Sequence, residues 1–421
     1  MPRHLVIIGN SAAALSAVRA IRARGGAEQI TIVSKEECHA YSPVLTTYYL
    51  RGAIPEQGLF ICDAGYYLDR DLDCHFGVAA VELDAEAQTV LFDDGTKVGY
   101  DALLIASGAS PKHLGGLDPE IAAEVCYLRT IEDARRIKEL ADRAKHIVVL
   151  GGGLVSLQVA SAVARPDLQV TCVVASEQVL SQNVDAECAE IIRDHIESSA
   201  NIDFLFGANV LHIGKADGGY RLSLDSGEAL AADMLVAGKG VVPNIDFVDR
   251  GQIAVDRGVL VDDRLRAQVD NVFAAGDLAQ GRNRVTGTVE LVPNWINACE
   301  QGRIAGMNMV GADGAFPGSV AENITTLFGV PVASIGVTRA GRDGADLREV
   351  KYRDNERGIY RKLLFQADAL VGAVLLRDIE DAGVLRSAIV SGANLGRLEK
   401  EVVAGSVGFA HTLHRCMFAK G

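Results

Sequence analysis

Two strand–turn–helix segments of the same kind constrain the fold of this chain more than any other feature. In the first, Val6–Ile8 leads into Gly9, and in the second, Ile147–Leu150 leads into Gly151–Gly153. Each has an apolar, β-branched strand, a turn of small residues and an apolar helix, which is typical of a βαβ unit whose helix N-terminus receives a pyrophosphate. One such turn is weak evidence. Two turns predict two dinucleotides, one that stays bound and one that exchanges.

Length and charge exclude several classes of partner. With 421 residues, two or three domains are expected. The net charge of −14 argues against nucleic acid and against an anionic membrane surface. Because the chain begins almost directly with a strand and its apolar runs are strand-sized, we expect no signal peptide, no membrane span and a cytoplasmic protein.

The cysteines predict no metal or cluster site held by this chain alone. None of the eight stands in a C-x-x-C pair, and several lie in apolar segments. Reduced, buried thiols are therefore expected.

A domain-scale duplication follows from the order of the predicted elements. Residues 3–9 and 28–34 are predicted strands around a helix at 12–24, and a second βαβ unit is predicted at 146–175. Each unit is followed by a strand that ends in a G-x-x-P turn, at Tyr100–Pro111 and at Ala232–Pro243.

The turn at Gly9, the segment Tyr100–Pro111 and the segment Asp270–Asp277 occur in one order along the chain. Together they resemble the FAD/NAD(P)-dependent pyridine-nucleotide oxidoreductase family. The resemblance implies an α/β fold with two Rossmann-like domains and a C-terminal α+β interface domain. It divides the chain into an FAD-binding domain at 1–112 and 244–318, an inserted NAD(P)-binding domain at 113–243, and the interface domain at 319–421.

The resemblance also implies an FAD site. Ser11 and Ala14 stand where the family has its second and third glycines, and Asp277 is expected to accept a hydrogen bond from a ribityl hydroxyl. Ser34 replaces the usual ribose acid, so Glu36 is the candidate for that contact, with a solvated surface glutamate as the alternative. The implied FAD-site residues are Gly9, Ser11, Ala12, Ala13, Ala14, Ser34, Glu36, Ser42, Pro43, Ala106, Ser107, Gly108, Gly276, Asp277, Asn294 and Trp295.

The second turn is the expected nicotinamide site. Ser156 replaces the third motif glycine, and Val174 stands where the acid that selects NAD is usual. No arginine pair follows, so NAD is favoured, NADP is not excluded, and Glu177 is a candidate substitute for the acid. The implied residues are Gly151, Gly152, Gly153, Leu154, Val155 and Gly240.

Residues 40–52 contain no redox cysteine, and no C-x4-C pair occurs in the first domain, so electrons must leave the flavin directly. Residues 40–52 and 293–306 instead resemble rubredoxin reductases and the FAD region of assimilatory nitrite reductases. In those relatives the segment that corresponds to 293–306 opens a helix whose N-terminus faces the flavin, and Pro293 suits the start of such a helix. No catalytic residue is certain; the flavin-proximal candidates are Tyr48, Gln158 and Trp295, and core packing is an equal alternative for Trp295.

The C-terminal part resembles the interface domain of flavoprotein subunits that serve iron–sulfur partners, on the segments 370–373 and 378–386. Examples are reductase components of 2-oxoacid oxidoreductases, notably phenylglyoxylate dehydrogenase. The apolar stretch 409–418 has two alternatives, a subunit contact or a helix packed on its own domain. A metal site from His411, His414 and Cys416 is the remotest reading of this stretch.

Three functional hypotheses follow. The first is an FAD-containing subunit that moves a hydride between NAD(H) and FAD, and single electrons to or from an iron–sulfur partner, in a multisubunit 2-oxoacid oxidoreductase. The second is a free-standing NAD(P)H-dependent rubredoxin or ferredoxin reductase. The third, suggested by Ser156, Gln158 and Val174, is a structural or regulatory flavoprotein subunit without nicotinamide turnover. An oligomer or hetero-complex is expected, and the direction of electron flow stays open.

Overall fold

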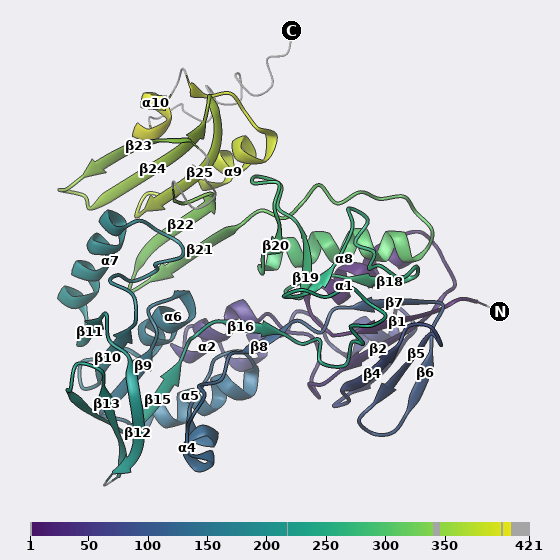
Figure 1. Ribbon diagram of the computed structural model, residues 1–421, viewed down its shortest axis with the longest axis horizontal. Helices are drawn as coiled ribbons and strands as arrows, with labels where there is room; N and C mark the ends of the chain where they lie inside the picture. Colours follow the sequence, from purple (N-terminus) through teal and green to yellow (C-terminus); the bar gives the residue numbers. More distant parts are fainter. Residues whose placement is uncertain (1, 217, 340–345, 397–398, 406–421) are drawn as a thin grey trace. The chain divides into compact units, whose positions relative to one another are not determined.

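The computed structural model describes residues 2–216, 218–339, 346–396 and 399–405 (Figure 1). The chain forms two compact units, each made of three segments. The first unit comprises Met1–Ser42, Pro55–Ser110 and Val241–Ala321, and the second comprises Pro43–Ile54, Pro111–Gly240 and Glu322–Gly421. The architecture is α/β with a β-rich C-terminal part, which confirms the predicted fold class. The finer division into three domains stays a prediction.

A five-stranded parallel sheet forms the centre of the first unit. Its order is β18-β7-β1-β2-β3, with bounds β18 Val272–Ala274, β7 Ala102–Ile105, β1 His4–Ile8, β2 Gln29–Ser34 and β3 Leu72–Phe76. Strand β1 is apolar and buried from Leu5 to Ile8 because both faces of the sheet are covered. Leu5 and Ile7 enter the core under the helices, and Val6 and Ile8 enter the core on the other face.

An antiparallel sheet (β4-β5-β6), a mixed sheet (β17-β19-β20) and several short elements complete the first unit. Residues of β4 and β5 pack against the second face of the parallel sheet. The bounds are β4 Ala80–Asp84, β5 Thr89–Phe92, β6 Lys97–Gly99, β17 Val259–Leu260, β19 Ala279–Arg282, β20 Val289–Leu291, η2 Glu56–Leu59 and α3 Ala64–Leu68.

Helices α1 (Ala12–Arg22) and α8 (Trp295–Met309) lie side by side (Figure 1). Two glycines of α8 make this close packing possible. A Cβ atom at Gly302 would lie 2.0 Å from the carbonyl oxygen of Ala13, and one at Gly306 would lie 2.5 Å from that of Ala17. Only a residue without a side chain fits at either position.

A second parallel sheet lies in the second unit, with the order β11-β10-β9-β15. A three-stranded antiparallel sheet, β12-β13-β14, belongs to the same unit. The strand bounds are β9 His146–Leu150, β10 Gln169–Val174, β11 Ile202–Phe206, β12 Val210–Ala216, β13 Gly219–Leu224, β14 Ala229–Ala232 and β15 Met234–Ala237. The helix bounds are η1 Pro43–Leu45, α2 Thr46–Leu50, α4 Pro119–Glu124, α5 Ile131–Arg143, α6 Leu154–Val163 and α7 Ala186–Ser199.

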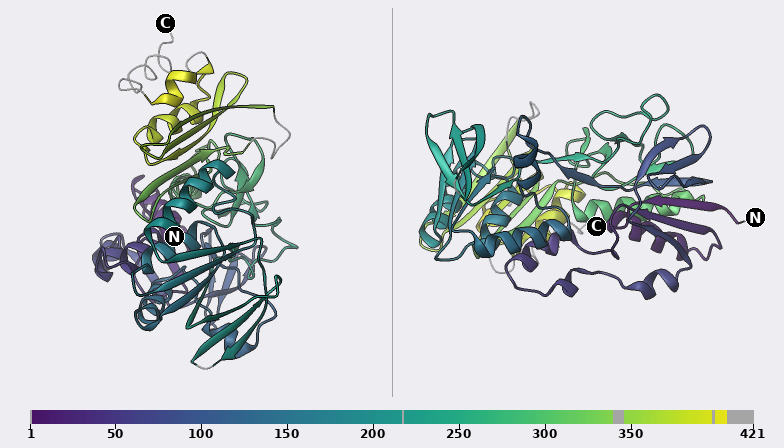
Figure 2. Two further views of the ribbon diagram at one scale, coloured as in Figure 1. Left: turned by 90° about the vertical axis from the view of Figure 1, so that its left-hand side faces the viewer. Right: turned by 90° about the horizontal axis from the view of Figure 1, so that it is seen from below.

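The C-terminal part of the second unit is a five-stranded antiparallel sheet with the order β21-β22-β25-β24-β23. Helix α9 packs against β22 and β25, and helix α10 packs against β23 and β24 (Figure 2). The bounds are β21 Glu322–Leu327, β22 Val330–Gly336, β23 Leu347–Asp354, β24 Ile359–Gln366, β25 Ala369–Leu376, α9 Ala382–Ser391 and α10 Glu399–Ala404. Apolar side chains of β21, β22, β24 and β25 join the core of the second parallel sheet.

The predicted elements agree with the structure except at their ends. The first helix ends at Arg22 rather than at residue 24. Helix α8 begins at Trp295, so Pro293 precedes the N-cap residue instead of opening the helix. Residues 409–418, with His411, His414 and Cys416, lie outside the described residues. Within the described parts of the chain, no helix is long and apolar enough to cross a membrane.

Candidate functional site: two dinucleotide turns

The first turn joins β1 to α1 and depends on Gly9. Its backbone has φ +122°, and its N–H donates to the carbonyl oxygen of Val33 over 2.7 Å. A Cβ atom here would lie 2.1 Å from the carbonyl oxygen of Ala106. Glycine is therefore required both by the backbone conformation and by the close approach of the neighbouring strand end.

Helix α1 starts at this turn with an open N-terminus. Its N-cap residue Ser11 is extended, and its side chain makes no capping hydrogen bond within the described part of the chain. Ala12, Ala13 and Ala14 are buried against the core. The helix N-terminus is thus free to face an anion while its first turn is fixed by packing.

Asn244 holds the strand end beside the first turn, a role that the sequence did not reveal. Its side-chain amide donates to the carbonyl oxygen of Ser107 over 2.9 Å, and its backbone N–H donates to that of Gly108 over 3.0 Å. The Ser107 hydroxyl donates to the Asn244 carbonyl oxygen over 2.7 Å. These hydrogen bonds lie beside the two-stranded sheet of β8 (Ala109–Pro111) and β16 (Val241–Pro243). Together they fix the segment that contacts Gly9.

Gln301 is a second residue that sequence reasoning missed. From α8 its side-chain oxygen accepts a hydrogen bond from the N–H of Gly276 over 2.7 Å, and its amide donates to Ser319 over 3.2 Å. Gly276 has φ +87°, and Asp277 follows it in the turn after β18. Gln301 therefore fixes the turn that presents Asp277.

The other implied FAD-site residues divide between the two units. Ser34 and Ser42 are buried in the first unit, and Pro43 opens η1 in the second. Glu36, the ribose candidate, is not simply solvated, because its carboxylate accepts a hydrogen bond of 2.6 Å from the Tyr41 hydroxyl.

The start of α8 is occupied by structural contacts. Asn294 is the N-cap residue; its side-chain oxygen accepts from the N–H of Asn297 over 2.8 Å, and its amide donates to Val320 over 2.9 Å. Trp295 is half-buried and packs against the core of α1 and α8.

The second turn has the same key geometry as the first. Gly151 has φ +136°, and its N–H donates to the carbonyl oxygen of Val173 over 2.9 Å. A Cβ atom at Gly151 would lie 2.5 Å from the carbonyl oxygen of Gly238, at the end of β15. One at Gly152 would lie 2.7 Å from Val174. Gly153 is the N-cap of α6, with open space around it.

Three residues at this turn differ from the pattern expected of a dinucleotide site: Ser156, Val174 and Glu177. Ser156, in the third motif position, is buried, and its hydroxyl donates to the carbonyl oxygen of Gly238 over 3.3 Å. Val174 fills the space behind Gly152. Glu177 is exposed and its carboxylate lies beside Gly207, after β11. Leu154 and Val155, the first residues of α6, are half-buried and exposed.

A lysine that sequence reasoning passed over stands next to the second turn. Lys239 lies between Gly238 and Gly240, and Gly240 has φ +94°. Among the described residues the Lys239 ammonium group has no ion pair or hydrogen bond, and partial desolvation lowers its pKa. The signal was present in the sequence as a cation between two glycines after a buried strand.

Tyr48 and Gln158 are brought together in the second unit, where both line one small pocket with Arg51 and Thr325. The Arg51 guanidinium lies over the Tyr48 ring, 4.1 Å from its centroid, and Gln158 donates to the Thr325 hydroxyl over 2.9 Å. Tyr48 and Gln158 are both uncharged, and Arg51 is the cation that sequence reasoning overlooked.

The seven cysteines in the described ranges are all free thiols. Burial raises the pKa of Cys126 to about 11 and that of Cys172 to about 12, so neither is a thiolate at neutral pH. Within those ranges no group of three or more His, Cys, Asp or Glu residues could hold a metal ion.

Both turns fit a dinucleotide pyrophosphate. In each, a glycine with positive φ lets the turn pack against the next strand end, and a helix follows whose N-terminus has no side-chain cap among the described residues. Two such sites in one α/β chain define a dinucleotide-dependent oxidoreductase.

The family model for the pyridine nucleotide-disulphide oxidoreductases matches residues 3–302 of this sequence. The family model for the rubredoxin NAD+ reductase C-terminal domain matches residues 323–393. The chain therefore belongs to the pyridine nucleotide-disulphide oxidoreductase family. The predicted resemblance and enzyme class are confirmed.

Relatives match over most of the chain. The NADH-dependent phenylglyoxylate dehydrogenase subunit epsilon of Aromatoleum evansii is 32% identical over 405 residues, 95% of this chain and 94% of that subunit. The rubredoxin-NAD(+) reductase of Pseudomonas putida is 29% identical over 315 residues, 74% of this chain and 81% of that reductase. The solved structure of the water-forming NADH oxidase from Lactobacillus brevis, bound to NADH, has a TM-score of 0.88 at 21% identity, covers 94% of this chain and 92% of that one, and shows the fold alone.

Proposed function

We propose that this chain is the FAD-containing electron-transfer subunit of a multisubunit 2-oxoacid oxidoreductase of the phenylglyoxylate type. It moves a hydride between NAD(H) and FAD, and single electrons to or from an iron–sulfur partner. The observation that carries the proposal is the pair of equivalent dinucleotide turns in a chain that is 32% identical, over 95% of its length, to an epsilon subunit named as part of such an enzyme.

The residues of the two turns have separate roles in this proposal. Gly9, Ser11 and the N-terminus of α1 hold the FAD pyrophosphate, and Gly151, Gly153 and the N-terminus of α6 hold that of the nicotinamide dinucleotide. FAD, when bound, supplies the chemistry that links two-electron hydride transfer to single-electron transfer.

The residues proposed near the flavin supply positioning rather than acid–base chemistry. Neither Tyr48 nor Gln158 is a carboxylate, an imidazole or a cation, and Gln158 is held by Thr325. Hydride transfer needs the two ring systems at a fixed distance and no proton donor. These side chains therefore shape the site, and Lys239 adds a positive charge for the dinucleotide phosphates.

The test of hydride transfer is an anaerobic stopped-flow experiment on the full chain loaded with FAD. We expect NADH to bleach the flavin absorbance within seconds, and NADPH to act more slowly. A flavin that stays oxidised for minutes with NADH would show that the catalytic part of the proposal is wrong.

Membership in a complex has its own test. Native purification under anoxic conditions should bring an iron–sulfur subunit along with the chain. The purified chain alone should reduce soluble acceptors slowly, and addition of the partner should raise the rate.

A free-standing rubredoxin or ferredoxin reductase is the second candidate. It is favoured by the match of residues 323–393 to the rubredoxin NAD+ reductase C-terminal domain and by the Pseudomonas putida relative. Rapid turnover of the chain alone with rubredoxin or ferredoxin, with no co-purifying subunit, would favour this candidate.

A further inference from the structure

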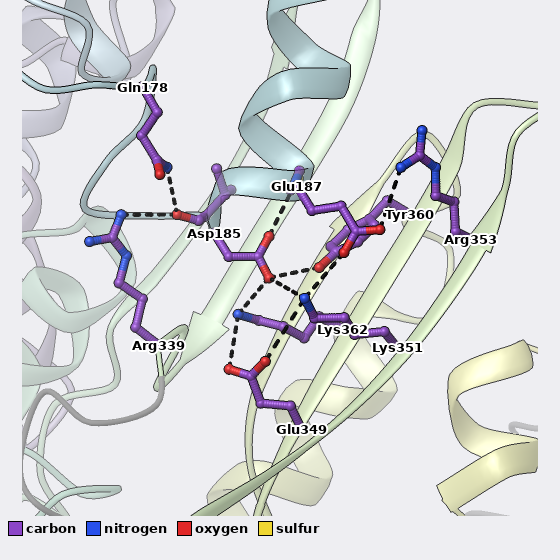
Figure 3. Close-up of polar contacts among 11 residues, drawn as sticks. Gln178, Asp185, Glu187, Arg339, Glu349, Lys351, Arg353, Tyr360 and Lys362 are labelled. Atoms are coloured by element: carbon purple, nitrogen blue, oxygen red, sulfur yellow. Dashed lines mark hydrogen bonds and ion pairs between the residues drawn. The ribbon is translucent and has the colours of Figure 1, made fainter. Parts of the chain in front are cut away.

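A network of charges around the buried Lys362 joins the C-terminal sheet to helix α7 within the second unit (Figure 3). Lys362 of β24 is 1% exposed, and its ammonium group lies 2.8 Å from the Asp185 carboxylate and 3.5 Å from that of Glu349. The Tyr360 hydroxyl donates to Asp185 over 2.7 Å. Lys351 of β23 extends the network, 3.1 Å from Glu187.

Asp185 is the centre of this network, and the network keeps it ionised. Burial alone would raise its pKa, but hydrogen bonds from Lys362 and Tyr360 hold the pKa below its ordinary value. The same carboxylate caps α7, since it accepts a hydrogen bond from the N–H of Cys188 over 3.1 Å. A buried charge of this kind is costly when its partner is removed, so the pair fixes the position of Asp185.

The segment directly before Asp185 reaches the second dinucleotide turn. The N–H of Val184 donates to the carbonyl oxygen of Leu180 over 3.1 Å, and the N–H of Leu180 donates to that of Gly152 over 2.7 Å. Leu180 has φ +49°, a conformation that a leucine keeps only when its surroundings hold it. A short chain of hydrogen bonds thus connects Asp185 to the turn.

A second contact from the C-terminal part holds the same segment. The Arg339 guanidinium donates to the carbonyl oxygen of Val184 over 3.1 Å, and the Gln178 amide donates to the same oxygen over 3.2 Å. Figure 3 shows both side chains directed at this backbone next to Asp185. Two separate groups, Lys362 of β24 and Arg339 after β22, therefore tie residues 178–185 to the C-terminal part of the unit.

In a βαβ nucleotide fold, the loop after the second strand lies beside the adenosine half of the dinucleotide. Residues 178–185 belong to this loop, because they follow β10. We propose that Lys362 and Arg339 are positioning residues for nicotinamide dinucleotide binding: Lys362 of the C-terminal sheet and Arg339, which follows β22, hold residues 178–185 against Gly152. This inference rests on the proposed function of the second turn.

The test is the dissociation constant for NADH, measured by fluorescence titration of the full, FAD-loaded chain. Lys362→Met removes the charge and keeps the length of the side chain, and we expect a roughly 3- to 30-fold rise in Kd with unchanged flavin content. Lys362→Arg should restore most of the affinity. Arg353→Gln is the matched control, because Arg353 lies at the exposed end of the network, 3.5 Å from Glu187; its Kd should change less than about 2-fold.

Arg339→Gln keeps the test decisive if Lys362→Met does not fold. It removes the hydrogen bond to Val184 and leaves Asp185 paired, and we expect a roughly 2- to 5-fold rise in Kd. Folded Lys362→Met and Arg339→Gln proteins that bind NADH as tightly as the wild type would overturn the inference, even if their melting temperatures fall. A wild-type chain that binds FAD but no NADH would instead overturn the proposed function of the second turn.

Discussion

The two dinucleotide turns share their first glycine and differ in what supports them. Gly9 and Gly151 both have positive φ and both lie against a carbonyl oxygen of the neighbouring strand end. The first turn is then supported by close helix packing, with Ala13 against Gly302. The second is supported by polar contacts, from the Ser156 hydroxyl and from the loop tied to the C-terminal sheet. The same local motif can therefore be stabilised by packing in one place and by hydrogen bonds in another.

The largest expected effect comes from disrupting the packing behind the first turn. Gly302→Ala places a Cβ atom 2.0 Å from the Ala13 carbonyl oxygen, so α1 must move away from α8. We expect a loss of about 2–3 kcal/mol in the free energy of unfolding and purification with little bound flavin. Denaturant unfolding and the flavin-to-protein absorbance ratio measure both.

Gly383→Ala is the matched control for this substitution. Gly383 lies in helix α9, and a Cβ atom there has no neighbour within 4 Å among the described residues. The free energy of unfolding should stay the same or rise by up to about 1 kcal/mol, because alanine favours a helix. Equal losses in both variants would contradict the role of Gly302.

Substituting the shared glycine should separate the two sites. Gly9→Ala and Gly151→Ala each force a strained backbone and a contact of 2.1 or 2.5 Å with a carbonyl oxygen, at a cost of about 2 kcal/mol. We expect Gly9→Ala to lose FAD. Gly151→Ala should keep FAD and lose its reduction by NADH, as measured by stopped flow.

Gly153→Ala is a control for the stability of the second turn only, because a Cβ atom there meets no protein atom within 4 Å among the described residues but lies where the pyrophosphate is proposed to bind. Its melting temperature should equal that of the wild type. If Gly151→Ala also lost its flavin, the two turns would not be independent sites.

The pH dependence of the free energy of unfolding should show whether an ionised Asp185 helps to hold the loop beside the second turn. The depressed pKa of Asp185 contributes stability that is present above its unfolded value, about 3.9, and is lost as the pH falls through the lower folded value. Asp185→Asn should therefore be less stable than the wild type by about 1–2 kcal/mol between pH 5 and 8.

Below about pH 4 this difference should begin to shrink, because the carboxyl of the unfolded wild-type chain then binds a proton while the folded carboxyl, with its lower pKa, is still ionised. Thermal unfolding of both proteins from pH 3 to 8 measures it. A difference that stays constant over the whole range would contradict an ionised, paired Asp185.

The smallest expected effect concerns the cation beside the second turn. Lys239→Ala should raise the Kd for NADH about 2- to 5-fold at low ionic strength, since one exposed charge near a phosphate contributes little. The difference should nearly vanish in about 0.5 M salt, where screening is strong. Lys112→Ala is a suitable control, because Lys112 is also an exposed cation near Gly240, to whose carbonyl oxygen its backbone N–H donates over 2.9 Å. An equal rise in the Kd for NADH in both variants would show that Lys239 has no special role.

The sequence by itself determined the two βαβ units and their turns. Gly9 and Gly151 were readable because strand, turn and helix are adjacent in the chain, and the α/β fold class followed from their order. Local patterns of apolar and small residues carry this information, since the conformation they require is set by neighbouring residues.

Tertiary structure alone decided what holds each turn in place. Gln301 meets Gly276, Gly302 meets Ala13, and Lys362 meets Asp185, in each case across a long stretch of intervening chain. A glycine in a helix or a lysine in an apolar strand carries no local sign of its partner. Their roles come from close packing and from paired burial of charge, which exist only when distant segments are brought together.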